Sequence, residues 1–125
     1  MTEKALTVVV VKVKPEKEEE FNHFYHTEHI PEFLHSFPEI LQAKRYVCTS
    51  QNIAMPEHPE GLINLGKHFL TVYEFPSEEV QRQVFERVQV PGRKERGAWD
   101  KMAGECLTFL SRNLYTEIFS KKGGQ

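Results

Sequence analysis

Cysteine is scarce in this sequence, and long apolar runs and an excess of basic charge are absent; each of these excludes a class of protein. Only two of the 125 residues are cysteines, Cys48 and Cys106. Their spacing fits neither a disulfide framework nor a zinc site, and we expect both to be small buried side chains in strands. No run of about 18 apolar residues occurs, so no membrane-spanning helix and no membrane partner are predicted.

The charged residues are nearly balanced and scattered along the chain. Lys and Arg number 16 against 18 Asp and Glu, which gives a formal net charge of -2. A nucleic-acid surface needs a basic stripe that displaces counterions, so nucleic acid is not expected as a partner. No secretory signal opens the sequence, and we therefore expect a cytoplasmic protein.

Motifs for phosphate binding, nucleophilic catalysis and metal binding are also missing. Pro91-Gly92-Arg93 does not open a strand-to-helix unit, and no serine lies in a nucleophile elbow. His26, His29 and Glu32 are spaced three apart, but the HExxH spacing of a zinc helix is absent and Pro31 disturbs the geometry. We therefore expect neither a metal nor another cofactor.

The segments that are present alternate in a way that predicts an α+β fold. Strands are expected over 5–13, 40–49, 67–75 and 105–110, with a short strand or arm over 114–119. Helices are expected from Glu16 to near Phe37 and from the N-cap Ser77 to about Val88, and a further helical piece over 94–102. The order β-α-β-β-α-β predicts a ferredoxin-like four-stranded antiparallel sheet with the helices on one face. We expect one domain over 1–120 and a loose tail over 121–125.

The first strand is apolar on both of its faces. Strand alternation separates Leu6, Val8 and Val10 from a second set on the opposite face, Val9, Val11 and Val13. Helices on one face of the sheet leave the other face uncovered. We therefore predict a two-fold homodimer in which two sheets face each other, with a ligand or a C-terminal arm covering part of the surface.

The segment 21–38 concentrates the titratable side chains, since four of the six histidines lie within it. On a regular α-helix Tyr25 would share one face with Glu28 and His29, because residues three and four apart stack over each other. Pro31 lacks an amide proton and disfavours helix at the residue before it. We therefore expect a kink or break there, with His29 at or near a helix C-terminus.

The same segment resembles a known family. Tyr25, Glu28, His29, Pro31, Arg45 and Tyr46 match the pattern WY…EH-x-P…PG-x…R-x-Y of the EthD-like branch of the dimeric α/β-barrel superfamily. Phe24 stands where that pattern has Trp, and Glu39 where it has Gly. The run 70–75 before a helix is similar to the third strand of the family.

The resemblance implies a fold and a pocket bounded by a sheet, but it does not select a reaction. The superfamily includes polyketide cyclases, lactone isomerases, antibiotic monooxygenases, haem-degrading enzymes and members without known activity. We expect a small-molecule-binding protein, with a cofactor-free cyclase or isomerase acting on an aromatic or polyketide-like ligand as one possibility. The alternatives are a non-catalytic ligand-binding or stress-related protein, and a haem-linked or cofactor-free monooxygenase.

Three residues are candidates for catalysis, and each has a structural alternative. His29 titrates near neutrality and is the candidate acid or base, or it caps carbonyl groups near the proline. Tyr25 is the candidate donor to a ligand oxyanion, or an amphipathic core tyrosine. Arg45 is the candidate anchor of a ligand carboxylate, or the ion-pair partner of Glu28 or Glu74.

Further residues are candidates for binding the ligand. They are Glu28, Tyr46, His68, Tyr73 and Trp99. We place the pocket between the first helix and the open face of the sheet. The segment 50–66, with two prolines and two glycines, is long for a hairpin connection and is either a loop that closes over the pocket or an ordinary surface excursion.

Overall fold

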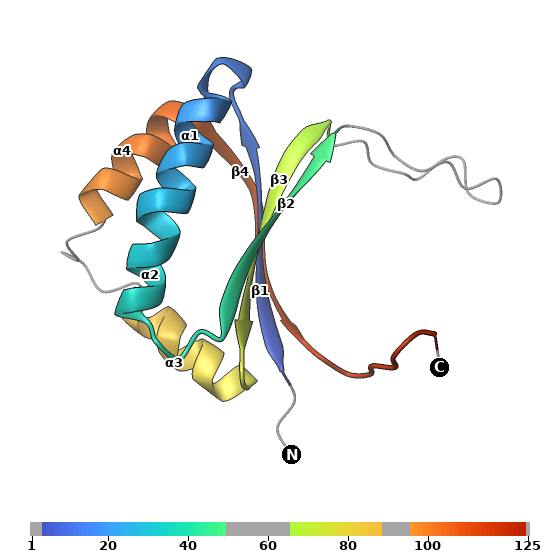
Figure 1. The fold of residues 1–125 in the computed structure, drawn as a ribbon. Coiled ribbons are helices and arrows are strands. Elements are labelled where there is room, and N and C mark those ends of the chain that lie inside the picture. The colour runs from blue at the N-terminus through green and yellow to red at the C-terminus, as the bar shows by residue number, and fades with distance from the viewer. Residues whose placement is uncertain (1–3, 50–65, 89–95, 125) are drawn as a thin grey trace.

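The structure, a computed structural model, describes residues 4–49, 66–88 and 96–124. In this part of the chain the helices form one layer against a single sheet (Figure 1). The expected closing loop over 50–66, except for Gly66, and the helix break at Pro91-Gly92 lie outside the described residues.

The sheet has four antiparallel strands in the order β2-β3-β1-β4. The strands are β1 (Ala5–Val13), β2 (Gln42–Thr49), β3 (Lys67–Phe75) and β4 (Leu107–Thr116). The two central strands, β1 and β3, carry the richest β-branched and aromatic runs of the sequence. The predicted ferredoxin-like α+β fold is confirmed.

The helices all lie on one face of the sheet (Figure 1). They are α1 (Glu18–Phe24), α2 (Ile30–Ser36), α3 (Glu78–Val88) and α4 (Arg96–Cys106). Ser77 caps α3 as predicted, since its Oγ accepts a hydrogen bond of 3.2 Å from the Val80 amide. On the buried side of α3, Gln81 donates to the Leu6 carbonyl at 2.7 Å, which ties this helix to β1.

Of the predicted kink or break at Pro31, the break is wrong, because a π-helical turn over Tyr25–His29 joins α1 to α2. In this turn the Ile30 amide donates to the Tyr25 carbonyl, five residues back. Pro31 falls in the first turn of α2, where a missing amide proton is tolerated. The helical segment therefore continues to Ser36, and His29 lies in its middle rather than at a C-terminus.

Three predicted boundaries are also corrected. β2 begins at Gln42 rather than Ile40, because Ile40 still belongs to a turn in which its amide donates to the Phe37 carbonyl at 3.1 Å. Cys106 ends helix α4 and is not in a strand. The pieces expected over 105–110 and 114–119 form one strand, β4, which pairs with β1 and has a bulge opposite Val10/Val11.

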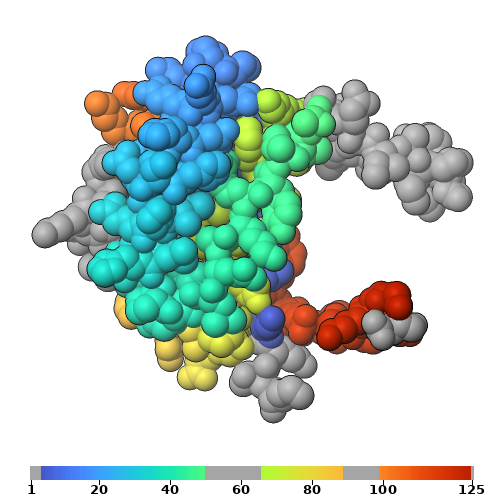
Figure 2. Space-filling model, viewed as in Figure 1, coloured from blue at the N-terminus to red at the C-terminus, as the bar shows by residue number. Residues whose placement is uncertain are grey.

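The helices cover one face of the sheet and leave the other face open. On β1, Thr7, Val9 and Val11 are buried beneath the helices, while the side chains facing the other way are only half-buried. On that open face Tyr46 and Tyr115 are about half exposed, at 51% and 49%. The chain beyond β4 runs away from the body on the same side (Figures 1 and 2).

No helix among the described residues is long and apolar enough to cross a membrane.

Candidate ligand-binding site

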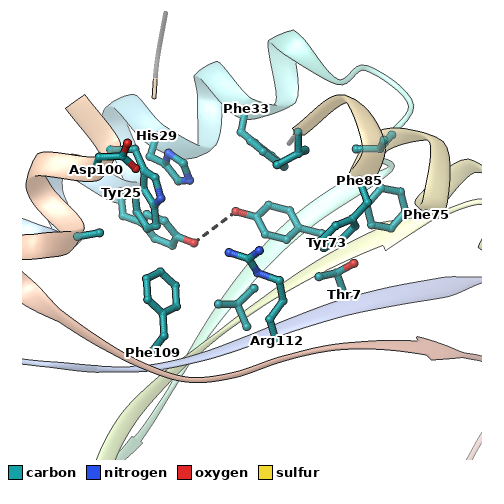
Figure 3. A pocket seen from close by; sticks show the side chains of 15 residues that line it. Thr7, Tyr25, His29, Phe33, Tyr73, Phe75, Phe85, Asp100, Phe109 and Arg112 are labelled. Atoms are coloured by element: carbon teal, nitrogen blue, oxygen red, sulfur yellow. Dashed lines mark hydrogen bonds between the residues drawn. The ribbon is translucent and has the colours of Figure 1, made fainter. Parts of the chain in front are cut away.

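A cavity of about 490 Å³ lies between the helix layer and the covered face of the sheet. Its volume is within the range of small-molecule sites, about 300–1,000 Å³. Most of its larger lining side chains are aromatic: Tyr25, Phe33, Tyr73, Phe75, Phe85, Trp99 and Phe109. Figure 3 shows several of these rings pointing inward from both layers. The pocket was predicted between the first helix and the open face of the sheet. The first helix in fact covers the other face, and the cavity lies there.

The helical side of the cavity is built by a ladder of rings spaced four residues apart. Its members are Phe21, Tyr25, His29, Phe33 and Phe37, and successive ring centroids are 4.9–5.8 Å apart. In a regular α-helix this spacing drifts by about 40° per step, or about 160° along the ladder. The π-helical turn holds one extra residue, which turns the later rings back by about 100°. The turn therefore keeps the ladder directed at the sheet.

The imidazole of His29 packs against two other rings of the cavity wall, Tyr25 and Trp99. It stacks on Tyr25 with a centroid distance of 4.9 Å and on Trp99 with a distance of 4.1 Å. The side chain is 8% exposed and lines the cavity. The ring nitrogen atoms are the groups through which this imidazole can exchange a proton with a ligand in the cavity.

Two tyrosine hydroxyl groups meet in the cavity. The Tyr25 and Tyr73 oxygens are 3.3 Å apart and share a hydrogen bond in which either can donate. Burial, together with the neighbouring phenol, raises the pKa of Tyr73 well above its usual value of 10.0. Tyr73 therefore stays protonated near neutral pH, so the pair supplies one proton to the shared bond and one to a ligand oxygen.

Arg45 lies behind Tyr25 and does not line the cavity. Its guanidinium carbon is 4.6 Å from the centroid of the Tyr25 ring, and its Nη1 donates to the Asn22 side chain at 2.7 Å. Its expected pairing with Glu28 or Glu74 is wrong, because the ion pairs among the described residues include neither Arg45 nor Glu28, and Glu74 pairs with Lys4 at 2.9 Å. Arg45 thus supports the ring of Tyr25 by a cation–π contact.

Three predicted binding residues lie outside the cavity. Glu28 is exposed on the helix, because the π-helical turn rotates it away from Tyr25 and His29. Tyr46 and His68 project from the open face, where strand alternation places them opposite the cavity side. The Nδ1 of His68 donates to the Gly66 carbonyl at 2.8 Å. The structure brings together only Tyr25, His29, Tyr73 and Trp99 from the predicted set.

Three further residues line the cavity but were not predicted from the sequence: Asp100, Phe109 and Arg112. The fourth strand was expected to end near Leu110, so no side was assigned to Arg112. Arg112 in fact pairs with Val9, whose side chain is buried beneath the helices. Plain alternation from the inward-facing Phe109 would have placed Arg112 on the open face, and the bulge opposite Val10/Val11 is what turns it to the cavity.

Residues with metal-binding side chains do not gather in this region. Among residues 4–49, 66–88 and 96–124, no group of three or more His, Cys, Asp or Glu side chains is arranged to hold a metal ion. In the set His26, His29 and Glu32, only His29 is buried in the cavity, while the other two side chains are exposed. His26 instead lies 3.1 Å from the guanidinium of Arg45, and its pKa is lowered by partial burial and by that cation.

The comparison with known proteins gives a match in structure but not in sequence. No protein-family model matches the sequence, and no curated protein matches it at a significant level. SnoaB, a cofactor-independent oxygenase from Streptomyces nogalater, superposes with a TM-score of 0.53 and 9% identity over 95% of this chain and 97% of its own.

Two further solved structures are similar. HapK from Hahella chejuensis gives a TM-score of 0.57 at 4% identity over 97% of this chain and 99% of its own. An ethyl tert-butyl ether D (EthD) family protein from Bacillus halodurans superposes with a TM-score of 0.51 at 16% identity, over 91% of this chain and 99% of its own. The fold implied by the sequence resemblance is thus confirmed, since these solved structures share the ferredoxin-like fold of this protein.

Proposed function

We propose that the protein binds a small aromatic ligand in the cavity between the helices and the sheet, and moves a proton on it without a cofactor. One observation carries this proposal: a buried imidazole and two phenol groups converge in an otherwise largely aromatic cavity. Titratable groups gathered in an apolar cavity are the usual mark of a site. The aromatic rings give affinity for a flat ligand by offset stacking.

Each polar group has a role that follows from its position. His29 accepts or returns a proton through a ring nitrogen, while Tyr25 and Trp99 stack on its imidazole and hold it in the cavity. The pair Tyr25–Tyr73 donates a hydrogen bond to the ligand oxygen on which negative charge develops. Enolisation, isomerisation and ring closure of an aromatic ketone all need these two functions.

The test uses 2-tetralone, an aromatic ketone whose exchange of α-protons for deuterium is followed by NMR. We expect the protein to accelerate the exchange and His29→Phe to abolish the acceleration, since phenylalanine keeps the stacking but has no nitrogen. Glu28→Gln, an exposed change on the next position of the same helix, serves as the matched control. Melting temperatures are measured together with the rates, so that loss of fold is separated from loss of function.

The outcomes separate an enzyme from a binding protein. Binding of 2-tetralone without accelerated exchange would favour a non-catalytic ligand-binding protein. A large loss of melting temperature in His29→Phe, with unchanged binding, would contradict the role of His29 in the site.

A cofactor-independent oxygenase is the second candidate, because SnoaB, a protein of that activity, shares the fold. Proton removal from a phenol or enol is also a first step that such chemistry requires. Oxygen uptake by the purified protein in the presence of an electron-rich naphthol would support it. Turnover that is equal under air and under nitrogen would exclude it.

We also propose that two copies of the chain associate through the open face of the sheet. Half-buried apolar residues occupy this face on β1 and β3, and Ile118 and Phe119 are 92% and 79% exposed at its side. Exposed apolar patches of this kind mark association surfaces. Val10→Glu, on the open face, should give a folded monomer in sedimentation, whereas Val9→Glu should unfold the chain. A folded wild-type monomer at micromolar concentration would contradict the dimer.

A further inference from the structure

Arg112 is a cation at the edge of the cavity that the proposed proton transfer does not use. Its strand position opposite Val9 directs it to the covered face of the sheet. Its guanidinium carbon lies 6.0 Å from the centroid of Phe109 and 5.9 Å from that of Phe85, so two rings steady the group. Figure 3 shows the guanidinium directed toward the hydroxyl groups of Tyr25 and Tyr73.

The charge of Arg112 is not neutralised by a carboxylate in the part of the chain that the structure describes. The ion pairs there use other cations, namely Lys4, Lys17, Lys67, Arg82 and Arg87. Asp100 also lines the cavity, but in Figure 3 it lies well apart from the guanidinium of Arg112. Arginine presents a rigid fork of donors that matches a carboxylate, so such a group favours an anion.

Arg45, the other arginine near the tyrosine pair, is also absent from these ion pairs, and its buried Nε and Nη2 have no hydrogen-bond partner among the described residues, but it does not line the cavity. Its Nη1 already donates to Asn22, and its guanidinium is packed against the ring of Tyr25. Arg112 reaches the cavity from β4, at the opposite edge of the sheet from β2, which carries Arg45; the positive charges of Arg45 and Arg112 both act to lower the pKa of Tyr73 against the larger effect of burial. The guanidinium and the one phenol proton that the tyrosine pair leaves for a ligand therefore converge where a ligand oxygen would lie.

We infer that Arg112 makes the cavity selective for aromatic ligands that carry an acidic oxygen, either a carboxylate or a phenolate. This inference rests on the proposed ligand site and specifies the chemical class that the site selects. Arg112 anchors the anionic oxygen, and the tyrosine pair donates to the same oxygen or to its neighbour. The aromatic body of the ligand then extends toward Trp99 and His29.

The test compares 2-naphthoate with 2-naphthamide, which has nearly the same shape but no charge. Trp99 is the only tryptophan of the chain and lines the cavity, so quenching of its fluorescence reports binding. We expect the wild type to bind the acid about 10-fold more tightly than the amide, a modest factor because Arg112 is partly exposed to solvent. Arg112→Met should remove the preference and leave the affinity for the amide unchanged.

Two further variants keep the result specific. Arg82→Met removes the same charge from the exposed side of α3 and should leave the preference intact. Arg112→Lys keeps the charge without the fork and should retain part of it. Equal binding of both probes by the wild type, or a preference that survives in Arg112→Met, would overturn the inference and leave the cavity proposal standing. Binding of neither probe would overturn both.

Discussion

The hydrogen bond between Tyr25 and Tyr73 joins the helix layer to the sheet and can be tested by removing each hydroxyl group. The two side chains are only 4% and 6% exposed, so a hydroxyl that loses its partner has little access to bulk water. The O···O distance of 3.3 Å is longer than the usual 2.7–2.8 Å of a hydroxyl pair. The bond should therefore contribute only about 0.5–1 kcal/mol to the free energy of unfolding, the weak end of the range for hydrogen bonds between uncharged groups.

We expect Tyr25→Phe and Tyr73→Phe each to lower the free energy of unfolding by about 1 kcal/mol, because each leaves one hydroxyl unpaired. The double variant should lose about 1–1.5 kcal/mol rather than the sum of 2, since no unpaired hydroxyl remains. For a chain of this length, 1 kcal/mol corresponds to about 3–6 °C in melting temperature.

The assay is urea unfolding of the wild type, the two single variants and the double variant. A second cycle that combines Tyr25→Phe with Tyr115→Phe is the control, because Tyr115 lies on the open face and makes no contact with this pair. The control cycle should be additive within about 0.3–0.5 kcal/mol. Strict additivity in the Tyr25–Tyr73 cycle would refute the coupling on which the donor pair depends.

The remaining predictions concern groups around the site and in the core. Arg45→Met should lower the free energy of unfolding, measured by urea unfolding, by about 1–3 kcal/mol, because the Tyr25 ring loses its cation–π contact. Arg45→Lys should lose less stability than Arg45→Met but remain less stable than the wild type. A hydrogen bond from Gln42 and the ion pair with Lys4 lower the pKa of Glu74 below 4.5. Its stabilising contribution is therefore present above pH 4.5 and lost as the pH falls through the lowered value, so Glu74→Gln should flatten the acid side of a stability–pH curve. Burial raises the pKa of the Cys106 thiol, which should react with a thiol reagent only after unfolding.

The sheet was predictable because β-branched runs and their alternation determine which residues face the helices. β1 alternates as expected, with Val9 and Val11 beneath the helices and Val10 on the open face. The end of β4 was not predictable, since its residues beyond Leu110 mix polar and apolar types without clear alternation. That strand pairs along the whole of β1, and only the bulge in this pairing, opposite Val10/Val11, turns Arg112 to the inward side.

The candidate site was partly predictable for a similar reason. Tyr25 and His29 were selected by helical spacing, and both line the cavity. Glu28 was selected by the same rule and lies outside, because the rule assumes 3.6 residues per turn and this segment contains a π-helical turn. Nothing local in the sequence distinguishes such a turn from a break at Pro31; the choice depends on packing the ring ladder against the sheet.

A crystal structure of the protein with 2-naphthoate tests the central claim most directly. We predict density for the naphthalene ring inside the cavity, against Trp99 and Phe33, with the carboxylate near Arg112 and the Tyr25 hydroxyl group. Density for the ligand on the open face of the sheet, against Tyr46, with an unoccupied cavity would contradict the account.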